Sequence, residues 1–557
     1  MKGTNEASGK KRGKKAGTPK RKKRLKLPFP EENEHTLRDF EEAYLAMMPS
    51  GASERVAIGL HRLLEGDPEG GQHCIEPLAE QAQQVGTATD LLRSAAHFAA
   101  AGHAETARAW VELVGSKFDP DSDDNRSAVM KPRRAHFDLW RIGCSHLLEG
   151  AGLDELEEII LTPGKDHATE DSLMRLHIDA ATVYALAGAW DRAFERCRQA
   201  SAPRLEEHVG ELVDLLLRRK AWSEVDELLT IVHEHITARL EEQDSYPPLP
   251  RLFLQIARTT SAMGVPEEGW KRLSPFWKRV PVDEEARWAA QGILVEALCA
   301  KLDSKALWEL IDDGYQALPR NPAPQARFVA LVARHDPEDN RDWILDTSRM
   351  LKRTPDLGQT GALTLGNIAE PMVTFGETDS LLRLYRRLPF GGTPWMQLAA
   401  ALDTDHPAFP QALENAFRIR PNSTNKHLVE SAVEMLRSIY ERGAMDSDLY
   451  GSLAENWIKE ADRDEMELEI LIDVFTRGGD VYSAYRAVKQ TSKAEREYAV
   501  ARMAHSALSA GHYSAVLGLA QGISDEFERY ALLRDVLGSA CTQYPYAYPW
   551  SPMDRYR

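Results

Sequence analysis

Apolar residues recur at helical spacing along most of the chain, from near Glu34 to about Ala540. Their recurrence at every third and fourth position is typical of amphipathic helices with one buried face. Alternation of apolar and polar residues, which is the sign of a half-buried strand, is nearly absent. The pattern therefore predicts an all-α chain with few or no strands.

A short turn returns between these helical stretches. It begins with glycine at Gly102, Gly188, Gly264 and Gly479, more loosely at Gly376 and Gly511, and with lysine at Lys220 and Lys301. Glycine ends a helix because it enters the left-handed conformation without steric cost. The Asp, Ser, Thr and Glu residues inside the turn can satisfy free amides at the start of the next helix. A recurring helix–turn–helix unit predicts a stack of helical hairpins.

Small residues occupy two fixed positions around these turns, where the two helices of a hairpin must cross closely. Seven residues before the turn position lie Ala95, Ala181, Ala257, Ala369 and Ala504. Five residues after it lie Ala107, Ala193, Gly269, Ala306 and Ala484. This register is difficult to obtain by chance, although a compact helical domain in which glycines merely end helices is the alternative.

The pattern resembles the tetratricopeptide repeat. In that family each helix of the hairpin carries a small residue, an aromatic follows the first one by three positions, and a proline often closes the unit. Phe98, Tyr184 and Phe475 occupy the aromatic position here, and Pro281 follows Gly264 at the spacing of the family's proline. The resemblance covers about residues 90–525. Uneven turn spacing also fits an irregular α-solenoid of a related kind.

The predicted organisation has three parts. Residues 1–30 form a disordered basic arm, residues 31–541 form the α-solenoid, and residues 542–557 form a tail of prolines and aromatics. We expect each hairpin to bury its apolar flank against its immediate neighbours only, which predicts an elongated superhelix. The tail either covers the last hairpin as a cap or serves as a docking peptide for another protein.

Charge is segregated between the arm and the rest of the chain. Residues 1–30 hold twelve Lys and Arg and one acid, Glu6, for a net charge of +11; because the whole chain carries −17, the remainder carries −28. Two clusters supply most of the arm's charge: Lys10, Lys11, Arg12, Lys14, Lys15, Lys20, Arg21, Lys22, Lys23 and Arg24. Such a segment binds polyanions such as RNA, DNA or a ribosome through counterion release. The alternatives are a solubilising tail, a nuclear-import signal, or an arm that masks the acidic body.

In tetratricopeptide proteins the concave face of the solenoid usually binds peptide segments of a partner, and the first helix of each hairpin lines that face. The resemblance therefore implies a groove for protein partners here. The charged residues on first helices that we predict to line it are Arg93, Arg175, Asp214, Arg258 and Arg502.

Motifs for catalysis, cofactors or metals are not found. The glycines at Gly358, Gly361 and Gly366 lack the lysine of a phosphate loop, and His233 and His235 are two apart on a helix, so they face different directions. Five scattered cysteines indicate free thiols in a reducing compartment. We expect neither a signal peptide nor a membrane span, and place the protein in the cytoplasm, or in the nucleus of a eukaryotic cell.

The primary hypothesis is therefore a non-enzymatic scaffold that binds proteins and uses no cofactor. The alternative is a nucleic-acid- or ribosome-associated factor anchored by residues 1–30. An enzyme hidden in a helical cleft is a third hypothesis.

Overall fold

The computed structural model describes residues 26–50, 54–119, 122, 131–161, 170–242, 250–280, 285–320, 322–388, 392–422, 426–461 and 464–543. Within these ranges the chain forms α-helices, two short 3-10 helices (Glu76–Gln81 and Ser274–Phe276) and turns, with no strand. The all-α prediction is confirmed for this part of the chain. Both basic clusters of the arm and the tail from residue 544 lie outside the described residues.

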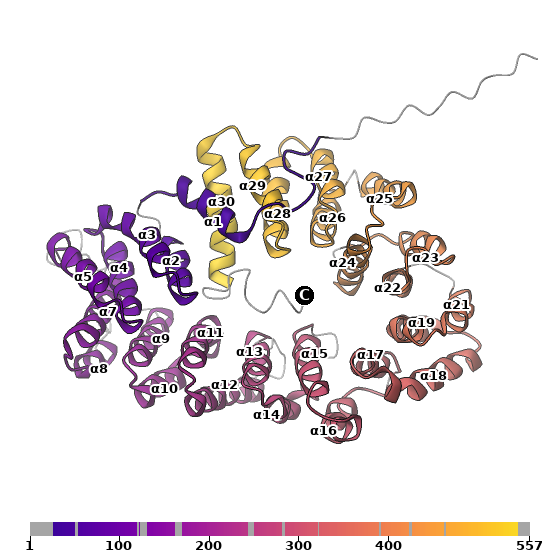
Figure 1. The fold of residues 1–557 in the computed structure, drawn as a ribbon, viewed down its shortest axis with the longest axis horizontal. Coiled ribbons are helices and arrows are strands. Elements are labelled where there is room, and N and C mark those ends of the chain that lie inside the picture. The colour runs from indigo at the N-terminus through magenta and orange to yellow at the C-terminus, as the bar shows by residue number, and fades with distance from the viewer. Residues whose placement is uncertain are drawn as a thin grey trace, which may run out of the picture.

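The helices form two concentric layers around a ring (Figure 1). The inner layer contains α2 (Glu54–Leu64), α4 (Val85–Ala100), α7 (Lys131–Glu149), α9 (Glu170–Leu186), α11 (Ala202–Arg219), α13 (Pro250–Ala262), α15 (Glu285–Cys299), α17 (Pro322–Ala333), α19 (Gly358–Asn367), α22 (Thr393–Ala401), α24 (Lys426–Glu441), α26 (Glu465–Arg477), α28 (Arg496–Ser509) and α30 (Glu526–Gln543). The short helix α20 (Ala369–Thr374) continues α19.

The outer layer contains α1 (Leu37–Met47), α3 (Pro68–Ile75), α5 (Ala104–Lys117), α8 (Asp154–Leu161), α10 (Trp190–Gln199), α12 (Trp222–Glu242), α14 (Pro266–Leu273), α16 (Ser304–Gln316), α18 (Pro337–Arg353), α21 (Thr378–Tyr385), α23 (Phe409–Ala416), α25 (Asp448–Ala461), α27 (Val481–Gln490) and α29 (Tyr513–Gln521). Each inner helix turns back into an outer helix, and each outer helix leads into the next inner one. The ring therefore has two edges, one formed by the hairpin turns and one by the loops between units.

The hairpin turns have the geometry that the sequence predicts. The six turn glycines all have φ between 72° and 93°, and Lys220 adopts the left-handed conformation with φ 54°. The residue after the turn position donates its N–H to a carbonyl five residues earlier, as His103 does to Phe98 at 2.8 Å and Asp480 to Phe475 at 2.8 Å. This hydrogen bond closes the inner helix as a Schellman motif.

Two further turns of this kind escaped the sequence pattern. Gly66 and Gly443 have φ of 88° and 67°, and the residues after them make the same bonds, to Arg62 and Ile439. The hairpin repeat therefore extends to the first unit and through the long interval before Gly479.

The small residues lie where the helices of a hairpin meet. All five residues at the position before the turn are fully buried, as are Ala107 and Ala484 after it. At Gly269 a Cβ atom would lie 2.1 Å from the hydroxyl of Thr260, so only glycine fits there. Ala306 is the exception, because it is only half-buried.

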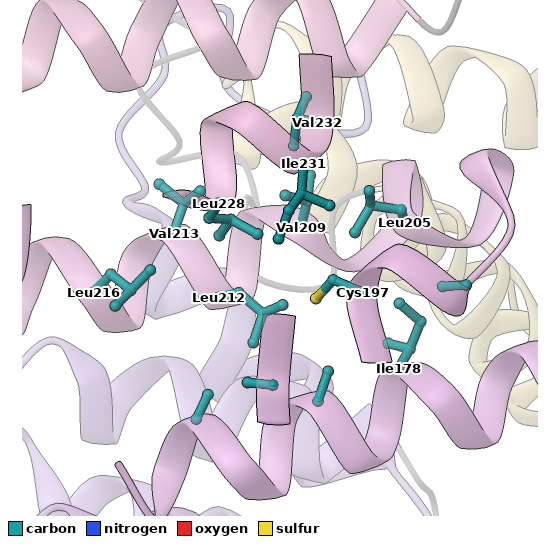
Figure 2. Close-up of a cluster of buried hydrophobic side chains, with 14 of the residues drawn as sticks. Ile178, Cys197, Leu205, Val209, Leu212, Val213, Leu216, Leu228, Ile231 and Val232 are labelled. Atoms are coloured by element: carbon teal, nitrogen blue, oxygen red, sulfur yellow. The ribbon is translucent and has the colours of Figure 1, made fainter. Parts of the chain in front are cut away.

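The apolar core lies between the two layers and divides into two large clusters, one in the N-terminal half and one that joins the C-terminal half to the first helices. Figure 2 shows one section, in which Ile178 of α9, Cys197 of α10, Leu212 of α11 and Leu228 of α12 converge. Each outer helix thus fills the space between successive inner helices, and each unit stabilises the next. Cys74, Cys144 and Cys197 are buried free thiols within this core, where burial raises their pKa well above that of an exposed cysteine.

The inner layer is closed. Each inner helix contacts the next one along the chain, and the last, α30, contacts the first, α2. In the outer layer α1 contacts α29, and Arg38 of α1 donates a hydrogen bond of 2.9 Å to Asp67 at the start of α3. The prediction of an elongated superhelix with contacts between neighbouring units only is therefore wrong, because the two ends of the array meet.

The segment that precedes α1 straps the two ends together. The side chain of Asn33 donates to the carbonyl of Gly511 at 2.6 Å and accepts from the amide of Ser514 at 3.1 Å. The hydroxyl of Ser514 in turn accepts from the amides of Glu34 and His35. We call residues 26–36 the strap. In Figure 1 it crosses the helices from α27 to α29 before it enters α1.

Apolar contacts hold the strap beside these hydrogen bonds. Phe29 is buried against Gly518 of α29, with its ring 6.2 Å from that of Tyr485 on α27. Leu27 and Phe29 belong to the same core cluster as Phe40 of α1 and Val536 of α30. Leu27 and Phe29, which the sequence analysis assigned to the arm, thus pack against the helices of the ring.

Cations at helix ends tie each unit to the one before it. Arg219 at the end of α11 donates to the carbonyls of Ala185 and Leu186 at the end of α9. Lys301, at the glycine position of its turn, donates to the carbonyl of Gly264 at 3.0 Å and to Glu267 at 2.9 Å. Since these carbonyls have no partner within their own helix, the cations satisfy them and fix the spacing of successive units.

The two lysines at the glycine position should respond oppositely to replacement by glycine. Lys220→Gly removes left-handed strain, so we expect stabilisation of about 0.5–1 kcal/mol. Lys301→Gly loses the bonds to Gly264 and Glu267 and gains no relief of strain, so we expect destabilisation of about 1 kcal/mol. Chemical denaturation of the two variants beside the wild type measures both, and shifts of the same sign would contradict this assignment.

Gly518→Ala should displace the strap. The added Cβ would lie 2.1 Å from the Cβ of Phe29, although alanine itself favours a helix. We expect faster hydrogen exchange in residues 26–36 and at the contact between α1 and α29. Gly451→Ala is the control, because nothing lies within 4 Å of its added Cβ. Unchanged exchange in the strap of Gly518→Ala would show that Phe29 does not hold it.

Candidate binding surface

The residues predicted to line a groove all lie on inner helices. Arg93 is on α4, Arg175 on α9, Asp214 on α11, Arg258 on α13 and Arg502 on α28. The side chain of Asp214 lies outside the described part of the structure. They are spread over the circumference of the ring instead of gathering at one place, and their role in binding stays a prediction.

The described side chains of this set already have partners within the ring. The guanidinium of Arg93 lies 5.8 Å from the ring centre of Trp140 on α7. Arg502 lies 3.7 Å from Glu469 on α26. These arginines therefore join neighbouring inner helices and are not simply solvated.

Ion pairs continue this linkage through the C-terminal half of the inner layer. Arg477 of α26 pairs with Glu430 of α24 at 2.6 Å and with Asp473 of its own helix at 3.3 Å. Asp473 also accepts a hydrogen bond of 2.7 Å from Ser506 of α28. Charge on the inner layer is thus largely balanced between adjacent helices.

Acidic groups approach one another in the N-terminal half. The pKa of Asp90 on α4 is raised to about 7, chiefly by burial; Arg93 opposes this shift, and the charges of Glu54 on α2 and Asp179 on α9 contribute to it. Asp179 is itself engaged by His136 of α7 at 2.6 Å. In the described part of the chain no group of three or more His, Cys, Asp or Glu side chains has an arrangement that could hold a metal ion.

A row of exposed apolar side chains is the feature that sequence reasoning missed. Met466, Tyr498 and Phe527 are 61%, 54% and 78% exposed. They lie in the first turns of α26, α28 and α30, three inner helices that contact one another in sequence. We call these three residues the apolar row. Because monomeric proteins seldom expose large side chains in succession, the row is a candidate contact surface.

The spacing of residues from the turn glycines is the feature of the sequence that points to the apolar row. Met466 and Tyr498 each lie thirteen residues before a turn glycine, Gly479 and Gly511. Equivalent positions in successive repeats fall on the same face of successive helices. The apolar row could therefore have been found from these two positions, whereas Phe527 has no following turn to set its register.

The remaining motifs singled out from the sequence have structural roles. Gly358 has φ 53° at the start of α19, and a Cβ at Gly366 would lie 1.9 Å from the side chain of Gln397. His235 contacts the carbonyl of Cys197 through its Nε2 at 3.0 Å. Among the described helices, none is both long enough and apolar enough to cross a bilayer.

Comparisons with known proteins show no family. No family model matches the chain, and a search of curated proteins finds no match. One solved structure, a "Circular tandem repeat protein with novel repeat topology and enhanced subunit contact surfaces", is similar over 90% of this chain and 98% of its own, at 12% identity and a TM-score of 0.14. That score is too low to support an argument. The helical repeat fold is shown, and the tetratricopeptide assignment stays a prediction.

Proposed function

We propose that the ring is a non-enzymatic scaffold that binds a polypeptide segment of a partner protein across the apolar row. The exposure of Met466, Tyr498 and Phe527 on consecutive inner helices is the observation that supports it. Large apolar side chains of this kind supply most of the energy of protein interfaces. The adjacent pair of Arg502 and Glu469 adds a polar margin that would orient the segment.

The spacing of the helices limits the kind of segment that fits. Packed helices lie about 8–10 Å apart, so the row extends over about 16–20 Å. An extended strand covers that distance with about six residues and a helix with about twelve. We therefore infer a short linear segment with two or three apolar side chains, flanked by charges of both signs.

Replacing part of the row should weaken partner binding. We expect Met466→Ser together with Tyr498→Ser to raise the Kd at least tenfold, because each exposed side chain would contribute about 1 kcal/mol or more to the interface. Proteins that co-purify with the full chain are identified first, and calorimetry then measures the Kd for the identified partner.

The matched control is Met350→Ser together with Trp222→Ser, which removes one methionine and one aromatic that are 45% and 47% exposed on outer helices. Equal weakening by both pairs, or no weakening by the first, would contradict the proposal. Turnover of a small substrate without any protein partner would favour the enzyme hypothesis instead.

A second candidate function is polyanion binding by the arm. Because Leu27 and Phe29 are buried, we consider residues 1–25 alone as the arm in this proposal; they carry eleven Lys and Arg against Glu6. A charge of +10 in so short a segment binds nucleic acid phosphates in a salt-dependent manner.

Neutralising the arm tests this function without damage to the strap. Replacement of the ten clustered Lys and Arg of residues 10–24 by Gln keeps the strap intact, whereas a deletion of residues 1–30 would remove Leu27 and Phe29. We expect affinity for a 30-nucleotide RNA to fall at least tenfold, with a shallower salt dependence, in fluorescence anisotropy. Unchanged affinity would exclude the arm as an anchor.

A further inference from the structure

Six cations gather at the C-terminal ends of four consecutive outer helices. They follow or end α16, α18, α21 and α23, which lie side by side along the outer layer in Figure 1. Because the outer helices all run in one direction, these ends share the edge formed by the loops between units. We call this set the basic edge; it contains Arg320, Lys352, Arg353, Arg386, Arg387 and Arg418.

Hydrogen bonds of Arg387 join the two helix ends in the middle of the basic edge. The guanidinium of Arg387 donates to the carbonyls of Leu351, Lys352 and Pro355 at 3.1–3.2 Å, and also to that of Thr354. It therefore caps the C-terminus of α18 and holds the end of α21 against it. Arg386 directly precedes Arg387 in the chain, and Lys352 and Arg353 end α18, so three further positive charges belong to the two helix ends that Arg387 joins.

Acidic partners are lacking along this edge. Within the described residues, Arg320, Lys352, Arg353, Arg386 and Arg418 are exposed and form no ion pair with Asp or Glu. The gaps at 321, 389–391 and 423–425 contain no acidic residue. Asp356 caps the amide of Gly358, and Asp346 pairs with Arg349 at 2.6 Å.

At several other outer helices a cation near the C-terminal end is paired with an acid, whereas Lys117 of α5 and Lys489 of α27 contact a carbonyl and an aromatic ring instead. Arg272 of α14 pairs with Asp226 at 2.5 Å, and Lys459 of α25 pairs with Glu455 at 3.0 Å. Arg198 of α10 pairs with Glu227. Favourable interaction with the helix dipole accounts for a cation at each of these ends. The basic edge differs in that, in the described part of the chain, exposed cations without an ion pair recur at the ends of four consecutive outer helices.

We propose that the basic edge binds the phosphate backbone of a nucleic acid without reading its sequence. Its cations recur at the ends of four consecutive outer helices, and five of the six are arginines, which can contact phosphates bidentately. A nucleic acid strand presents a continuous row of phosphates, so phosphates along one strand can meet the cations of successive units. Among the described residues between 320 and 420, the exposed large hydrophobics include no aromatic side chain, so these residues offer no stacking on bases.

This inference goes beyond the binding of a protein segment, since the apolar row lies on α26, α28 and α30 and the basic edge on α16 to α23. It is also independent of the arm. A body that carries −28 outside residues 1–30 repels polyanions in general. An uncompensated basic stretch on such a body therefore marks where a polyanion can approach.

Charge reversal on the basic edge tests the inference in the full chain. The test variant carries K352E, R353E and R386E, and leaves Arg387 in place because it caps α18. The control carries R108E, R141E and K305E, which reverse two arginines and one lysine at exposed positions on α5, α7 and α16. Both variants change the net charge by −6, so they differ only in where the charge is removed.

Fluorescence anisotropy with a labelled 30-nucleotide RNA and the corresponding single-stranded DNA supplies the readout. We expect the test variant to bind at least tenfold more weakly than the control at about 100 mM salt, with the slope of log K against log salt reduced by about 2. Thermal unfolding followed by circular dichroism checks that both variants fold. If the test variant does not fold, K352Q, R353Q and R386Q replace it.

The same measurement in a chain with the arm neutralised separates the two cationic elements. If the basic edge binds RNA, charge reversal on the edge weakens the affinity both with the native arm and with the neutralised arm. If the arm does not bind RNA, neutralising the arm has no effect of its own and only the effect of the edge is measured. Equal loss in the control variant, or no loss in the test variant, would overturn the inference. Competition by polyglutamate as effective as that by RNA at equal charge would overturn it too, and would assign the edge to an acidic polypeptide.

Discussion

The packing of the first helices against the last ones is the constraint on which the ring depends. Hairpins that stack only on their neighbours leave an exposed apolar face at each end of the array, and repeat proteins usually cover these faces with capping repeats. Here α30 packs against α2, and α1 lies between α29 and α3. Each end therefore caps the other.

The strap makes this contact specific. Asn33 accepts a hydrogen bond from the amide of Ser514 across some 480 residues of sequence, and the hydroxyl of Ser514 accepts one from the amide of Glu34. Phe29 packs against Gly518, where a side chain would collide with it. The entropy cost of closing so long a loop grows only slowly with its length. A modest set of contacts can therefore hold the ends together, provided that the curvature of the stacked units already brings them near.

Much of the local structure was predictable from the sequence, whereas the closure was not. The left-handed glycines and the buried alanines at the crossing points follow from short-range rules. By contrast, the ring closes because each unit is rotated slightly relative to the one before it. The total rotation depends on all the units, so no single residue predicts the closure. Lys301 shows the same limit locally, because its role depends on Gly264 and Glu267 of the preceding unit.

The candidate site was likewise predictable from the sequence only in part. The five charged residues predicted to line a groove lie on inner helices, and two of them, Arg93 and Arg502, contact Trp140 and Glu469. Two members of the apolar row share a spacing from the turn glycines that is visible in the sequence. Only the folded structure shows that these positions are exposed and do not belong to the core. Together with the basic edge, the apolar row presents two chemically different surfaces on one rigid scaffold.

Direct imaging of the isolated full chain tests the central claim most clearly. Electron microscopy of the dilute monomer should give class averages of a closed ring, in which the N-terminal strap and α1 contact α29 and α30. Open arcs or elongated superhelices as the prevailing form would contradict the account, because the ends would then lack the contacts that cap them.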